Sequence, residues 1–295
     1  VVSASVNDDT IAWYENDGAN DPNFTAVDIS TTADSANGVF VADIDGDGDL
    51  DIVSSSWKDD TIAWYESDVA SNNDEGVYAQ VDDDYTATSG SVTFSPGETV
   101  KTFTVTVKED LIPENNEAVK FVLSNPSNAT IDDGSGVVEI NDDDTTVWSA
   151  TDIVTNADDA QDVKVADMDG DGDLDIVSAS PTDDTVAWYE NNGAADPSFT
   201  KAVIATSADE VRNIDLADMD GDGDMDIVSA SGVDDTIAWY ETDGAADPTW
   251  AAADIATSAD GAHDVYIADM DNDGDLDIVS ASIHDDTIAW YENDG

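Results

Sequence analysis

A repeat of 51 residues constrains this chain more than any other feature of its sequence. The heptapeptide Asp-Thr-Ile/Val-Ala-Trp-Tyr-Glu occurs five times, and the nonapeptide Asp-x-Asp-Gly/Asn-Asp-Gly-Asp-x-Asp occurs four times. Neighbouring copies of both strings lie 51 residues apart, except across one interval of 124 residues, which is 73 longer than the period. The heptapeptides begin at Asp9, Asp60, Asp184, Asp235 and Asp286. Since both strings agree on the period and on the interruption, the chain is a repeat array with one insertion.

Within one period the apolar residues alternate over short runs, which is the periodicity of strands. In the repeat that starts at Val163, such runs span residues 163–166, 174–180, 185–190 and 199–205. Four strands in about 40 to 50 residues are typical of a propeller blade. The sequence lacks the Trp-Asp dipeptide of WD40 repeats, the Gly-Gly pairs of kelch repeats and the stripes of a helical solenoid. The predicted fold is therefore all-β, a multi-bladed β-propeller with four-stranded blades.

The long interval places an inserted module inside the second blade. Residues 1–66 are predicted to hold a partial blade and most of a second one, and residues 67–144 form the insert. Residues 145–295 then supply the end of the second blade, two full blades and a partial blade. The insert is expected to be β-sandwich-like, with alternating runs at residues 91–94, 100–107, 118–123 and 136–140. Both partial blades contain second and third strands, so we expect an excerpt of a longer array.

The charge of the chain excludes several classes of partner. Seventy acidic residues face 7 basic ones, so the formal net charge is −63. Such a field repels nucleic acid and anionic lipid, and no apolar run approaches the roughly 20 residues that span a bilayer. We therefore expect no nucleic-acid partner and no membrane insertion in this segment. A hydrophobic content of 40% supplies a core, and the lack of Cys excludes disulfides and thiolate sites.

The acidic nonapeptides are the candidate functional sites. In the copy that begins at Asp167, side-chain oxygens stand at positions 1, 3, 5 and 9, and position 7 can add its backbone carbonyl. Ca²⁺ takes about six to eight oxygen ligands, and Gly at position 6 permits the turn that brings position 9 back. We predict about one Ca²⁺ per loop, four in the propeller. The predicted ligands are Asp43, Asp45, Asp47, Asp49, Asp51, Asp167, Asp169, Asp171, Asp173, Asp175, Asp218, Asp220, Asp222, Asp224, Asp226, Asp269, Asp271, Asp273, Asp275 and Asp277.

Three alternatives for these loops fit less well. An EF-hand requires Glu at position 12, whereas the four loops have Ser there, and their flanks have strand patterns rather than helical ones. Mg²⁺ keeps several waters and seldom uses an all-protein cage. A solvated acidic turn without an ion would leave five Asp within nine residues repelling one another, in four separate places.

The blades resemble the FG-GAP or VCBS-type repeats of integrin-like propellers. The resemblance rests on Val-x-x-Ala-Asp-x-Asp-Gly-Asp-Gly-Asp-Leu-Asp-Ile-Val-Ser-Ala-Ser followed by Ile-Ala-Trp-Tyr-Glu-Asn, and it covers residues 1–66 and 145–295. It implies Ca²⁺ at the periphery of each blade, usually seven blades in a ring, and a role in adhesion or ligand display.

The insert resembles a Calx-beta module. Its motifs are the stretch 84–98, the acidic turn at Glu109-Asp110, and the closing residues 141–144. The match covers about the C-terminal two-thirds of such a module. The resemblance implies further Ca²⁺ ligands, with a solvated acidic edge as the alternative. These residues are Asp84, Glu109, Asp110, Asp142, Asp143 and Asp144.

Two functions remain open at this point. The first is a non-enzymatic, calcium-binding structural, adhesion or display module, secreted or at the cell surface, with a protein or glycan ligand. The second is an accessory or carbohydrate-binding propeller of a secreted polysaccharide-active enzyme. The sequence has no Gly-x-Ser-x-Gly elbow and no Cys nucleophile, so we expect no enzymatic activity in this segment. The five Trp-Tyr pairs could stack on sugars, but their fixed place in the repeat favours packing between blades, with Trp and Tyr on opposite faces.

Overall fold

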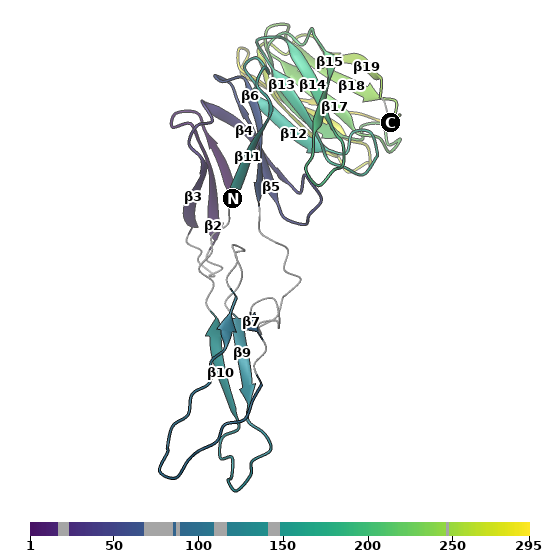
Figure 1. The fold of residues 1–295 in the computed structure, drawn as a ribbon. Coiled ribbons are helices and arrows are strands. Elements are labelled where there is room, and N and C mark those ends of the chain that lie inside the picture. Colours follow the sequence, from purple (N-terminus) through teal and green to yellow (C-terminus); the bar gives the residue numbers. More distant parts are fainter. Residues whose placement is uncertain (17–23, 68–84, 87–88, 109–116, 141–147, 246–247) are drawn as a thin grey trace. The chain divides into compact units, whose positions relative to one another are not determined.

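The computed structural model describes residues 1–16, 24–67, 85–86, 89–108, 117–140, 148–245 and 248–295. These residues form strands and no helix, which confirms the all-β fold class (Figure 1). No described segment is a helix that is long and apolar enough to cross a membrane. The chain divides into two compact units. We call Val1–Ser67 with Trp148–Gly295 the repeat unit, and Asp68–Val147 the insert unit.

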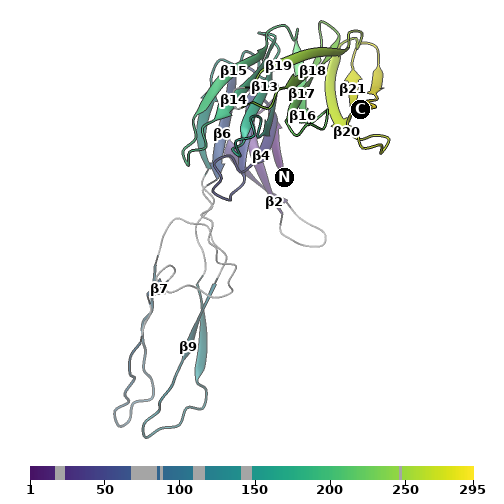
Figure 2. The same ribbon diagram turned by 90° about the vertical axis from the view of Figure 1, so that its right-hand side faces the viewer.

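The repeat unit contains five antiparallel sheets, which we number as blades 1 to 5 in chain order (Figure 2). Blade 1 consists of β1 (Val2–Ser5), β2 (Thr10–Asn16) and β3 (Phe24–Ser30). Blade 2 consists of β4 (Ala36–Ala42), β5 (Asp51–Ser56), β6 (Thr61–Ser67) and β11 (Trp148–Val154). Blade 3 consists of β12 (Asp162–Ala166), β13 (Asp175–Ser180), β14 (Thr185–Asn191) and β15 (Phe199–Ala205). Blade 4 consists of β16 (Val211–Ala217), β17 (Asp226–Ser231), β18 (Thr236–Thr242) and β19 (Trp250–Ala256). Blade 5 consists of β20 (Ala262–Ala268), β21 (Asp277–Ser282) and β22 (Thr287–Tyr291).

Blades 2 to 4 have the four strands that the repeat predicts, in simple meander order. In blade 2 the fourth strand, β11, lies on the far side of the insert in sequence, yet it pairs with β6 and sets Ala150 opposite Tyr65. The sheet of blade 2 is therefore assembled from both sides of the insertion.

The core lies between successive blades, where the Trp and Tyr side chains meet. Trp64 of blade 2 shares a buried cluster with Tyr189 of blade 3, and Trp188 of blade 3 shares the next one with Tyr240 of blade 4. Trp64 and Trp188 are only 2% and 3% exposed. Because side chains alternate across a strand, each Trp faces the following blade and each Tyr the preceding one. The predicted packing role of the Trp-Tyr pairs is thus confirmed in these blades.

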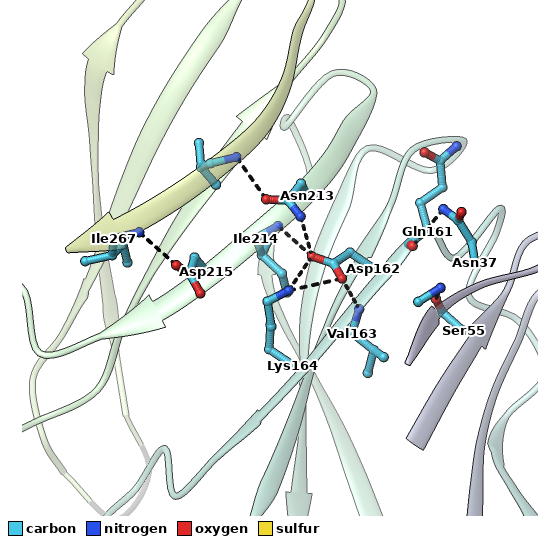
Figure 3. A network of polar contacts seen from close by, with 12 residues as sticks. Asn37, Ser55, Gln161, Asp162, Val163, Lys164, Asn213, Ile214, Asp215 and Ile267 are labelled. Carbon is cyan, nitrogen blue, oxygen red and sulfur yellow. Dashed lines mark hydrogen bonds and ion pairs between the residues drawn. The ribbon is translucent and has the colours of Figure 1, made fainter. Parts of the chain in front are cut away.

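Polar contacts join the first strands of neighbouring blades (Figure 3). The Oδ2 atom of Asp162 in blade 3 accepts hydrogen bonds from the Ile214 amide at 3.1 Å and from Asn213 Nδ2 at 2.8 Å, both in blade 4. Asn213 Oδ1 in turn accepts one from the Val265 amide of blade 5 at 3.0 Å. Burial raises the pKa of Asp162, while Lys164, whose Nζ lies 3.1 Å away, and the amide donors act in the opposite direction. These contacts fix the register between blades.

The insert unit forms two short antiparallel ladders over its described residues. One pairs β7 (Tyr85–Thr86) with β8 (Thr106–Val107), and the other pairs β9 (Glu117–Val122) with β10 (Ser135–Ile140). The strand expected at residues 91–94 is wrong, since this stretch is coil, and only the end of the run 100–107 is a strand. Alternation stabilises a strand only where another layer covers its apolar face. Here Val92 and Val100 are exposed.

Candidate metal centres

Each acidic nonapeptide connects the first and second strands of its blade. In blade 3 the loop starts at Asp167, directly after β12, and ends at Asp175, the first residue of β13. Position 2 of the loop points into the core: Met168 is 1% exposed and packs in the cluster between blades 3 and 4. The sequence interpretation missed this anchor, although every loop has Ile or Met at that position. The two strands and the anchor hold both ends of the loop.

The loop backbone curls through two residues with positive φ. In blade 3 these are Gly170, at position 4 with φ 75°, and Gly172, at position 6 with φ 102°. The sequence predicted the requirement at position 6. In blade 5 position 4 is Asn272, with φ 65°, a left-handed conformation that Asn tolerates better than most residues. Position 6 is Gly in all four loops, because its φ of 102° to 105° lies beyond that region.

Backbone amides of the loop donate to the carboxylates inside the curl. The two oxygens of Asp167 accept hydrogen bonds from the amides of Gly170 at 2.8 Å and Gly172 at 3.1 Å. Asp169 Oδ1 accepts one from the Asp171 amide at 3.2 Å, and Asp171 Oδ1 accepts one from the Asp173 amide at 2.9 Å. These bonds hold the carboxylates of positions 1, 3 and 5 against backbone amides of the loop.

The carboxylate at position 9 is buried and joins the loop to the third strand. Asp175 is 1% exposed. Its Oδ2 accepts a hydrogen bond from the Met168 amide at 3.1 Å, and its Oδ1 accepts one from the Asn191 amide at 2.8 Å. Burial raises the pKa of Asp175 to about 6, and the two amide donors act in the opposite direction. Asp51 has the same arrangement, and burial raises its pKa to about 6 as well. The carboxylate at position 9 therefore links the loop to the third strand of the blade through hydrogen bonds.

In each of the four loops, three carboxylates come close enough to share one metal ion, with one oxygen from each lying within 4.8 Å of the others. Positions 1 and 3 belong to every cluster, and the third member is position 9 in blades 2 and 3 and position 5 in blades 4 and 5. The clusters are Asp43, Asp45 and Asp51; Asp167, Asp169 and Asp175; Asp218, Asp220 and Asp222; and Asp269, Asp271 and Asp273.

Position 7 belongs to none of these clusters. The carboxylate of Asp173 lies so close to Gly193 that a Cβ atom there would clash with Oδ2, and Asp224 lies against Gly244 in the same way. The side chain at position 7 therefore packs against the glycine turn that follows the third strand. This arrangement fits the expectation that position 7 offers its backbone carbonyl to an ion.

The chemistry of these clusters suits a hard cation. In the loop of blade 2, Oδ1 of Asp43 is buried and has no hydrogen-bond partner among the described residues. Burial, together with the charges of Asp47 and Asp43, raises the pKa of Asp45. A divalent cation would relieve both the unpaired buried oxygen and the mutual repulsion of the carboxylates. Oxygen-only donors favour Ca²⁺ or Mg²⁺ over softer metals.

The second predicted site lies outside the described residues. The Calx-beta resemblance implies six acidic ligands in the insert unit, and none of the six is among the residues that the structure describes. A calcium site there therefore stays a prediction.

Comparison with known families gives two matches. The sequence matches the FG-GAP-like repeat over residues 1–54, 167–229 and 218–280, which together cover more than half of the chain. It matches the Calx-beta domain over residues 69–144. A search of curated proteins found no match.

Proposed function

The chain belongs to the family of FG-GAP-like repeat proteins, and from this premise we propose that it is a calcium-binding, non-enzymatic display or adhesion module of the cell surface or extracellular space. Members of this family and of the Calx-beta family are repeat and binding domains that are typically extracellular. The single observation that carries the proposal is the set of four carboxylate clusters at equivalent places in four blades.

Calcium is proposed to bind through the side chains of positions 1, 3, 5 and 9 and the backbone carbonyl of position 7. Ca²⁺ accepts this number of oxygen ligands in flexible geometry, whereas Mg²⁺ prefers an octahedral shell with several waters. A ligand that binds only the folded state stabilises it by about 2.7 kcal/mol at a hundredfold excess over Kd. Four such sites are comparable to the net stability of a typical domain, about 5 to 15 kcal/mol. The ions would thus be part of the fold.

A protein is the better-supported class of ligand for the display function. Stacking on sugars would require accessible aromatic faces, but Trp64 and Trp188 are buried between blades. The carbohydrate-binding alternative therefore receives no support from the aromatic pairs of blades 2 and 3.

Calcium titration of the purified chain tests the proposal. We expect calorimetry of metal-depleted protein to detect about four sites in the repeat unit, and Tm to rise on addition of Ca²⁺ and to return on chelation. Replacing Asp167 and Asp169 by Asn should remove one site, because both lie in the blade 3 cluster. Asp264→Asn is the matched control, since this exposed Asp lies outside the loops. An unchanged Tm with no heat of binding would rule the proposal out.

A further inference from the structure

The interface between blades 3 and 4 contains a cavity of about 290 Å³. Both blades have all four strands, so the cavity lies between two complete sheets. Its lining includes Ser231 at the end of β17, whereas the acidic nonapeptide of blade 4 ends at Asp226, where β17 begins. The cavity is therefore separate from the candidate metal centre of its blade.

The blade 4 side of the cavity combines two carboxylates with an aromatic ring. Asp234, Asp254 and Tyr240 all line it. Ala252 stands opposite Tyr240, and Asp254 stands opposite Ala238, so these side chains share the face of the sheet that is turned toward blade 3. Burial raises the pKa of Tyr240, and the charges of Asp234 and Asp254 act in the same direction. Among the described residues that line the cavity there is no Lys, Arg or His.

Blade 3 shows which group lies at the equivalent place. Lys201 stands opposite Tyr189, and its Nζ lies 5.7 Å from the centre of that ring. Burial raises the pKa of Asp183, and the charge of Lys201 is one of the influences that oppose this shift. Asp183 and Asp234 occupy the same place in the repeat. In blade 3, a lysine ammonium group thus lies near both the aromatic ring and the carboxylate.

Two differences in the fourth strand distinguish blade 4 from blade 3. Ala252 stands where blade 3 has Lys201, so blade 4 has no ammonium group beside Tyr240. Asp254 stands where blade 3 has Val203, so blade 4 has a second carboxylate. Blade 4 therefore keeps the ring and the first carboxylate, gains a negative charge and has a cavity in place of the lysine.

We propose that this cavity binds an alkylammonium group, such as the side chain of a lysine from a partner protein. The ammonium group would lie over Tyr240 and near both Asp234 and Asp254, because the face of an aromatic ring and a carboxylate each attract a cation. The methylene groups would contact Ile204 and Ala208 of blade 3, which also line the cavity. This site is additional to the proposed calcium-binding function, and its occupation does not require the acidic loops to hold an ion.

A metal ion suits this cavity less well than an alkylammonium group. Ca²⁺ takes about six to eight oxygen ligands, whereas the ring of Tyr240 and the aliphatic side chains supply none. Among the described residues, Asp234 and Asp254 belong to no group of three that could share an ion. The cavity thus favours an organic cation, which can use the apolar walls as well as the charges.

The test requires a readout of one blade, because blade 2 has similar residues at these places. Ala150 stands opposite Tyr65 there, and Asp152 stands opposite Ala63. Fluorine NMR of the chain labelled with 3-fluorotyrosine resolves single rings, and Tyr240→Phe and its blade 3 counterpart assign the two resonances of interest. All titrations contain Ca²⁺ in excess and the same salt concentration.

The probe is Nα-acetyl-lysine amide. We expect it to shift the Tyr240 resonance saturably and to leave the Tyr189 resonance nearly unchanged, because Lys201 already lies over that ring. Nα,Nε-diacetyl-lysine amide, which has no charge, should shift neither resonance. A Kd for 1,5-diaminopentane at least tenfold below that of the lysine derivative would identify a free diamine as the source of the group, and a similar or higher Kd would support a lysine side chain.

A substitution that fills the cavity tests its role directly. Ala252→Lys supplies the ammonium group from the chain itself, so the probe should bind at Tyr240 at least tenfold more weakly. Ala251→Lys is the matched control, since it adds the same charge at an exposed neighbour on the other face of the strand. Circular dichroism verifies that both variants fold.

The reciprocal exchange should create the site in blade 3. The double variant Lys201→Ala with Val203→Asp gives blade 3 the residues of blade 4, so the probe should now shift the Tyr189 resonance. The proposal is overturned if the Tyr240 resonance ignores the probe, if the neutral derivative shifts it equally, or if its response survives Ala252→Lys.

Discussion

Aspartate has three distinct roles within one repeat, and its position decides which. Asp167 accepts hydrogen bonds from amides of its own loop, and Asp175 accepts one from an amide of the third strand. Asp184 has φ 55°, and its Oδ1 accepts the Glu210 amide of the next blade at 3.0 Å. All three are acidic residues in a chain rich in them, so residue type alone does not separate a metal ligand from a structural acceptor.

A pair of substitutions in one loop tests the backbone requirement at the residue scale. Gly172→Ala should destabilise the protein by about 1 to 3 kcal/mol, because φ 102° strains any residue with a Cβ atom. No described atom lies within 4 Å of the added Cβ, so the loss reports backbone strain alone. Gly170→Asn should change stability by less than about 0.5 kcal/mol, since Asn272 occupies that position in blade 5. Urea unfolding in excess Ca²⁺ measures both, and equal losses would contradict the expectation.

At the scale of elements, the turn between the second and third strands fastens each blade to the next. Oδ1 of Asp60 accepts the Asp159 amide at 3.0 Å, and Oδ1 of Asp235 accepts the Gly261 amide at 2.9 Å. The sequence interpretation used the Asp-Thr that opens the heptapeptide only to measure the period. Its recurrence in all five repeats was the signal of this second role.

Two equivalent turns separate the inter-blade hydrogen bond from local strain. Asp235 has φ 59° and Asp286 has φ 56°, so Ala at either site adds the same left-handed strain, about 1 to 2 kcal/mol. Of these two residues, Asp235 accepts an amide of the following blade, and no such bond is seen for Asp286 within the described residues. A hydrogen bond to a charged group is worth about 1.5 to 3 kcal/mol more. Asp235→Ala should therefore cost clearly more unfolding free energy than Asp286→Ala in chemical denaturation. Equal costs would show that the bond contributes nothing.

At the scale of the whole molecule, acidity and calcium are coupled through the buried position 9. Burial raises the pKa of Asp51 and Asp175 to about 6, above the value of about 3.9 for an unfolded chain. Between these two values the folded state binds more protons than the unfolded state. Folding stability of the calcium-free protein therefore falls as pH rises through this window, and the charge of −63 acts in the same direction.

Stabilisation by calcium should depend on pH in the opposite direction, because Ca²⁺ binds deprotonated carboxylates. As the pH is lowered from 7 to 5, we expect the Tm of metal-depleted protein to rise. Over the same change in pH, the gain in Tm on adding Ca²⁺ should shrink. Thermal unfolding at matched ionic strength, followed by circular dichroism, measures both trends. If the Tm of the metal-depleted protein fell on acidification to pH 5, the expected effect of burial on position 9 would be wrong. If the calcium-dependent gain in Tm were constant from pH 7 to pH 5, the expected link between calcium binding and deprotonation would be wrong.

Repetition made much of the candidate site predictable. The loops, the turn glycine at position 6 and the acidic positions are local features that recur with the period, so the sequence displays them directly. It was less informative about the insert, where alternation at residues 91–94 predicted a strand that the structure lacks. That segment has no repeat partner to test the pattern, and none of the described residues covers it with a second layer.

The sequence by itself determined the all-β repeat, the four-stranded blade and the clustering of acids into four loops, because each follows from periodicity along the chain. Only the tertiary structure decided which carboxylates meet. Position 9 reaches the third strand, position 7 turns to a glycine two strands away, and Asp162 bonds to the next blade. These outcomes depend on which backbone amides and rings the neighbouring strand or blade presents. The packing of distant segments sets those neighbours, and the local pattern does not encode them.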